Sequence, residues 1–105
     1  MFNPSESFTA TVTIKSPMGP IKAFVNIDPV DATHFTGNAK LMGKEAPITG
    51  GLRNGSSFVG DISLMLPFGK ANIRIEVAID ENGTIKGEAI MPHRKGMTIT
   101  GSVDA

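Results

Sequence analysis

Apolar and polar residues alternate along most of the chain. In the segment FTATVTIK, which begins at Phe8, every second residue is apolar, and threonine or lysine occupies each position between. A period of two is typical of a β-strand with one buried face and one solvated face. The alternation recurs at residues 8–14, 21–27, 35–41, 46–52, 58–64, 73–79, 85–91 and 97–103. No segment keeps a helical period over several turns, so we expect almost no helix.

The two halves of the chain share one plan. FTATVTIKSPMG, from Phe8, aligns without a gap on FVGDISLMLPFG, from Phe58, and IKAFVNID aligns on IRIEVAID after a shift of two residues. Later segments align in the same order and pair Gly37 with Gly87, Ala39 with Ala89, and Gly50 with Gly101. We interpret residues 1–105 as one domain made of two four-strand repeats, about residues 8–55 and 58–105.

Short links separate the predicted strands. They carry Pro, Gly or Asn, which hairpin turns favour, as in Pro17-Met18-Gly19 and Pro67-Phe68-Gly69. Because short links make successive strands antiparallel neighbours, the chain is expected to form a meander. We therefore predict an all-β fold, an eight-stranded antiparallel up-and-down meander closed into a small barrel, since closure removes exposed sheet edges. A two-sheet sandwich is the alternative.

Every position on the predicted inner face is apolar or Gly. The inward set of the fourth segment, for example, is Ala46, Ile48, Gly50 and Leu52. Phe8 and Phe58 are expected to point inward near one end of the barrel, about half a barrel apart. General acid–base catalysis needs a titratable group beside the reacting atom, so we expect no catalytic residue inside. The interior is either a packed core or a cavity in which inward Gly and Ala residues leave room for a ligand.

An eight-stranded antiparallel meander around an apolar interior resembles the calycins, the family of lipocalin and streptavidin-like barrels. The resemblance spans nearly the whole chain but lies in the pattern alone. The chain has no Trp and no Tyr, so it lacks the Gly-x-Trp of lipocalins and the biotin-binding Trp and Tyr set of streptavidin. The resemblance implies a barrel whose interior often holds a small ligand, and it transfers no binding residue.

Composition excludes several classes of protein. Ten basic and ten acidic residues give a net charge of zero, and Tyr and Trp are missing, so we expect no nucleic-acid partner. Cys is missing and no metal-ligand spacing occurs, so we expect no metal and no cofactor. No apolar run is long enough to span a membrane, and the N-terminal MFNPSES lacks a secretory pattern, which favours a cytoplasmic location.

The two ends of the predicted barrel differ in charge. The links after the first, third, fifth and seventh strands meet at one end, which we call the Pro-x-Gly end. The basic residues near it, which only Glu45 opposes, are Lys15, Lys22, Lys40, Lys44, Lys70, Arg94 and Lys95. The other end, which we call the acidic end, holds both termini and most of the Asp and Glu residues. His34 and His93 fall at opposite ends, too far apart to share a metal or a proton.

We expect non-enzymatic binding of a small apolar or amphipathic ligand, for which an anionic head group is one option. Apolar side chains ringed by basic ones suit such a ligand. The predicted site residues are Met18, Met42, Phe68, Lys44, Lys70, His93, Arg94 and Lys95.

Two other functions stay open. The first is an oligomeric structural or interaction module with a packed core, whose partner would be a second copy of the chain bound through the fifth to seventh strands. The outward apolar residues there are Val59, Met65, Ala78 and Ile90. The second is an enzyme or enzyme subunit that acts on an anionic substrate near His93.

Overall fold

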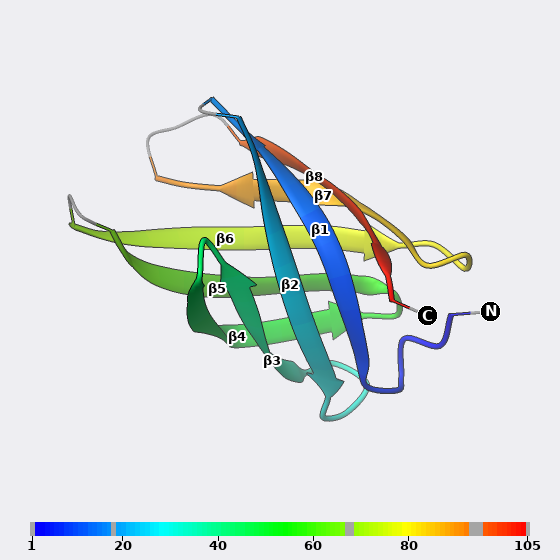
Figure 1. Ribbon diagram of the computed structural model, residues 1–105. Helices are drawn as coiled ribbons and strands as arrows, with labels where there is room; N and C mark the ends of the chain where they lie inside the picture. The colour runs from blue at the N-terminus through cyan, green and yellow to red at the C-terminus, as the bar shows by residue number, and fades with distance from the viewer. Residues whose placement is uncertain (1, 18, 67–68, 93–95, 105) are drawn as a thin grey trace.

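The eight strands close into one barrel in sequence order. The computed structural model describes residues 2–17, 19–66, 69–92 and 96–104, and of residues 64–66 it describes the backbone alone. The strands are β1 (Phe8–Ser16), β2 (Gly19–Pro29), β3 (Phe35–Leu41), β4 (Lys44–Asn54), β5 (Ser57–Leu66), β6 (Gly69–Ile79), β7 (Thr84–Ile90) and β8 (Met97–Val103). Each pairs antiparallel with the next, and β8 pairs with β1 (Figure 1). The predicted meander barrel is confirmed, and the sandwich alternative is wrong.

Helix is missing from the part of the chain that the structure describes. No helical segment there is therefore long and apolar enough to cross a membrane.

The first hairpin of each half has the same register. Gly19 begins β2 and Gly69 begins β6, with φ angles of 115° and 131° that suit glycine in a tight turn. The register gives the matching opposed pairs Phe8–Ile27 and Phe58–Val77. In these two hairpins, positions fifty residues apart are therefore equivalent in register. The sequence alignment of IKAFVNID on IRIEVAID instead pairs positions 52 residues apart, and the internal repeat stays a prediction.

Steric contacts explain why residues 37 and 87 are both glycine. Gly37 lies opposite Ile27, and a Cβ atom on it would collide with the backbone carbonyl of Asn26. Gly87 lies opposite Val77, and a Cβ atom on it would collide with the backbone carbonyl of Glu76. Each glycine lets two strands approach closely inside a small barrel, as expected from its inward position.

A β-bulge in β4 changes the predicted inner face of that strand. Thr49 lies opposite Asp61 and Leu52 opposite Val59, so β4 has one residue more than β5 over this stretch. Gly50 is the extra residue, with φ of 61°. Gly51 is buried against Phe35 in its place, and Leu52 is 52% exposed. The predicted inward positions of Gly50 and Leu52 are therefore wrong, because an added residue reverses the faces of the strand.

Three phenylalanine rings meet inside the acidic end. The ring centroids of Phe8 and Phe58 lie 5.6 Å apart, and those of Phe35 and Phe58 lie 5.3 Å apart, both with edge-to-face geometry. We call Phe8, Phe35 and Phe58 the aromatic floor. Phe8 and Phe58 point inward as predicted, from β1 and β5, which are half a barrel apart in the strand order, and their rings meet across the narrow interior. Phe2 stacks edge-to-face on Phe8 at 4.9 Å.

The two chain ends lie together at this end of the barrel (Figure 1). Near the C-terminus, both carboxylate oxygens of Asp104 accept hydrogen bonds of 3.0 Å, from the hydroxyls of Thr9 and Thr11. Near the N-terminus, Phe2 N donates to the Glu81 carbonyl oxygen at 3.0 Å. These contacts fasten β1 to β8 and hold Phe2 over the aromatic floor.

Candidate ligand cavity

The barrel encloses a cavity of about 610 Å³. All eight strands contribute inward residues to its wall, and the aromatic floor lies at its acidic end. The cavity reaches the other end of the barrel, where Ser16, Pro17, Gly19 and Pro20 line it from the β1–β2 turn. We call these residues, together with Met42, Met91 and Met97, the cavity mouth.

Hydrocarbon forms almost the whole wall of the cavity. Among its described lining residues, Ser16 alone has a polar side chain, and its Oγ donates to the Gly19 carbonyl oxygen at 2.6 Å. No polar or charged residue is buried in the part of the chain that the structure describes. This wall can exclude water and contact hydrocarbon, but it offers no group to accept or donate a proton in a reaction.

Several inward residues in mid-barrel are only half-buried. Val25, Ile75 and Val77 point inward by the alternation of their strands, yet each retains exposed surface. In a packed barrel such residues would be fully buried. All three line the cavity, which counts against the packed core predicted as one alternative.

Met42 lines the cavity mouth from the β3–β4 turn. Leu41 and Lys44 are opposed across a two-residue loop in which Met42 has φ of 51° and Gly43 has φ of 74°. Positive φ at both positions is typical of a type I′ hairpin turn. A side chain with a Cβ is disfavoured there, and Met42 is nevertheless present and 57% exposed. Met42 lines the mouth, and its part in ligand binding stays a prediction.

The other predicted site residues divide into two groups. Lys44 is the first residue of β4 and Lys70 is the second residue of β6. Both are exposed at the same end as the mouth, and neither lines the cavity. The remaining members of the prediction lie outside the described residues: Met18, Phe68, His93, Arg94 and Lys95. Pro17, Pro20, Met91 and Met97 line the mouth and were not predicted as site residues. The sequence feature that could have identified these four residues as mouth residues is their position at or next to the ends of alternating segments.

The charge difference between the two ends is smaller than predicted. Lys86 is exposed near the start of β7, at the acidic end, and Glu88 is exposed near the other end of the same strand. Lys40 lies directly opposite Glu45. The positive charge near the mouth is therefore limited to small areas around residues such as Lys15 and Lys70.

Charged residues interrupt the outward apolar positions of β5–β7. Val59 lies opposite Glu76, and Ile90 lies opposite Arg74. Arg74 Nε lies 3.8 Å from Glu76 Oε2. Binding of a second copy through this face stays a prediction, and Met65, the fourth predicted residue, has its side chain outside the description.

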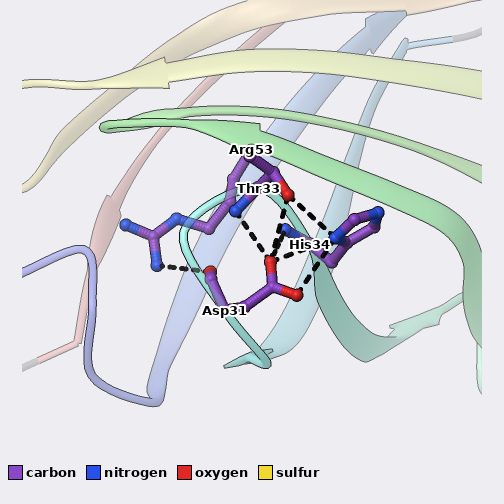
Figure 2. Close-up of polar contacts among 4 residues, drawn as sticks. All are labelled: Asp31, Thr33, His34 and Arg53. Carbon is purple, nitrogen blue, oxygen red and sulfur yellow. Dashed lines mark hydrogen bonds and ion pairs between the residues drawn. The ribbon is translucent and has the colours of Figure 1, made fainter.

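A polar cluster at the acidic end involves the first of the two histidines (Figure 2). Asp31 Oδ1 accepts from the backbone N–H groups of Thr33 and His34, both at 2.8 Å, and lies 3.0 Å from His34 Nδ1. These hydrogen bonds, that of the Thr33 N–H foremost, lower the pKa of Asp31 from 3.8 to about 2. Arg53 Nη1 donates to the Asp31 carbonyl oxygen at 3.3 Å.

This cluster fastens the loop between β2 and β3 onto β4. Arg53 N also donates to the Thr33 carbonyl oxygen at 2.9 Å. All four residues lie away from the cavity wall, and the described residues contain no group of His, Asp and Glu side chains that could hold a metal ion. The contacts that the structure shows for this cluster are those that join the loop to β4. His93 lies outside the described residues.

Comparisons with protein-family models, with curated proteins and with solved structures found no match to this chain. The likeness to the calycins stays an expectation, and the function is inferred from the cavity itself.

Proposed function

We propose that the protein binds a small apolar or amphipathic ligand inside its barrel and performs no reaction on it. The observation that carries the proposal is the apolar cavity of about 610 Å³. This volume falls within the roughly 300–1,000 Å³ that is usual for small-molecule sites. A void lined by hydrocarbon loses dispersion contacts that a hydrocarbon guest restores, so an apolar ligand is favoured over water.

The ligand is oriented by the difference between the two ends. The aromatic floor closes the acidic end, and the mouth opens at the end that carries Lys15 and Lys70. A polar head group finds no partner inside and therefore stays at the mouth, in contact with solvent. Nearby lysines favour a head group with negative charge.

The other functions predicted from the sequence have less support. An oligomeric module was expected to have a packed core, and the interior holds a cavity instead. An enzyme acting near His93 depends on residues outside the description, and no titratable group among the described residues lines the cavity.

The test is binding of cis-parinaric acid, a fluorescent 18-carbon fatty acid, to the wild type and to two matched variants. Val25→Trp places a large side chain in the cavity. Asn26→Trp places the same side chain one residue further along β2, on the outer face of the barrel. We expect the wild type and the Asn26 variant to bind alike, and the Val25 variant to bind about tenfold or more weakly because the space is filled. Absence of binding by the wild type, or equal binding by both variants, would contradict the proposal.

A third variant tests the head group. Lys70→Glu is expected to weaken binding of cis-parinaric acid at low salt, with the difference shrinking as ionic strength rises, because exposed charges are screened. The uncharged methyl ester of the same acid is the control, and its binding should not respond to this substitution. Equal responses of acid and ester would show that the head group does not need to be anionic.

A further inference from the structure

The cavity is deep along the barrel axis. Successive inward residues of β1 run from Phe8 at the floor to Ser16 at the mouth, eight residues further on. At a rise of about 3.3 Å per residue, and with the usual strand tilt of a barrel, this corresponds to a depth of roughly 20 Å. A site of this depth, closed at one end, suits a molecule longer than it is wide.

At the acidic end the cavity is lined by packed phenylalanine rings, and no polar side chain lines it there. Phe58 is the central ring of the aromatic floor, since it contacts both Phe8 and Phe35, and it is 3% exposed. Phe2 supports the floor from behind, because it stacks on Phe8 and does not line the cavity. A hydrocarbon chain that enters from the mouth can therefore advance only as far as these rings.

We infer that the aromatic floor acts as a length gauge, and that the ligand is an amphiphile with one polar head and one unbranched hydrocarbon chain. The inference rests on the proposed function and adds a ligand class to it. Every methylene that fits between the mouth and the floor is removed from water, and each one that exceeds this length stays outside or forces the floor to move. Affinity should therefore rise with chain length, reach a maximum and then stop rising.

The experiment measures the affinities of straight-chain saturated carboxylic acids from 8 to 20 carbons, by displacement of bound cis-parinaric acid at concentrations below micelle formation. Below the maximum, two added carbons should strengthen binding on the order of tenfold, from about 0.8 kcal/mol per buried methylene. Phe58→Leu deepens the cavity and should move the maximum to longer acids. Val77→Phe fills space directly above the floor, opposite Phe58, and should move the maximum to shorter acids.

Phe2→Leu is the matched control. It makes the same substitution as the Phe58 variant, in a ring that touches the floor without lining the cavity, so the maximum should stay at the wild-type length. If the Phe58 variant does not fold, Val77→Phe and Phe2→Leu still decide the result. An affinity that rises without a maximum in the wild type, or a maximum shared by all folded variants, would overturn the length gauge while leaving ligand binding intact. Failure of every acid and of cis-parinaric acid to bind would overturn the proposed function as well.

Discussion

Met42 combines a strained backbone with a place at the cavity mouth. The sequence predicted its position, because a Met-Gly pair between two alternating segments is expected in a hairpin turn. Leu41 pairs with Lys44, which leaves a loop of two residues, and a loop of this length requires the positive φ of Met42. This φ angle could not be predicted from the sequence. Because backbone strain of this kind is often retained at functional positions, it supports the proposed role of Met42 at the mouth.

The substitution Met42→Asn separates the strain from the function. Asn tolerates positive φ, and Asn-Gly is the preferred pair for this turn. We expect the variant to be more stable by about 0.5–1 kcal/mol in urea unfolding and to bind cis-parinaric acid more weakly, since an apolar contact at the mouth is lost. Gly43→Ala, at φ of 74°, is the control and should be less stable than the wild type. A destabilised Met42 variant would contradict the account of the turn.

Through Asp31, the stability of the folded protein is expected to depend on pH in the acid range. Its pKa of about 2 in the folded state lies below the ordinary value of 3.8, so the ionised carboxylate favours folding. This contribution is complete above about pH 4 and disappears as the pH falls through about 2. Asp31→Asn should therefore be less stable than the wild type at pH 5, with a difference that narrows between pH 4 and pH 2. Urea unfolding at several pH values measures it, and a difference unchanged at pH 2 would argue against this role.

The hydrogen bonds between Asp31 and its neighbours Thr33 and His34 were not predicted from the sequence. The available signal was local, since an Asp followed by Thr two residues later often accepts from backbone N–H groups in a turn. The period-two pattern of the flanking segments carries no information on such hydrogen bonds within the loop.

At the scale of single strands, alternation predicted most inner faces and failed in one place. β4 follows its predicted face through Ile48 and departs from it at Gly50. The alternation of apolar and polar residues does not reveal one extra residue in a strand. It assigns Leu52 to the inner face whether or not the bulge is present. The adjacent glycines Gly50 and Gly51 were the available signal, because a glycine inside a strand often marks a bulge.

Gly37 and Gly87 allow neighbouring strands to lie close together. Gly87→Ala should destabilise the protein by about 1–3 kcal/mol, because the added Cβ collides with the Glu76 carbonyl in a packed strand pair. Lys86→Ala, one residue earlier on the exposed face, is the control and should have an effect within about 0.5 kcal/mol. Thermal and urea unfolding measure both. Equal effects of the two substitutions would mean that the close approach of β6 and β7 is not required.

At the scale of the whole molecule, the closed barrel could be predicted and its hollow interior could not. Closure follows from eight alternating segments and short links, both of which are local features of the sequence. Whether the interior is filled depends on the tilt and stagger of the strands and on the side chains that meet across it. Those quantities arise only when all strands are assembled, as in the contact between Phe8 and Phe58. The charge difference between the ends was overestimated because Lys86 and Glu88 were left out of it.

The central claim is that a hydrocarbon chain lies inside the barrel with its head group at the mouth. The most direct measurement is nuclear Overhauser contacts between bound dodecanoic acid and the protein, with the acid labelled separately at its terminal methyl group and beside its carboxylate. We expect the terminal methyl group to contact the rings of Phe8 and Phe58 or the methyl groups of Val25 and Ile75 above them, and the methylene beside the carboxylate to contact Met42. Contacts confined to the outer face, or a carboxylate end that contacts the aromatic floor, would contradict it.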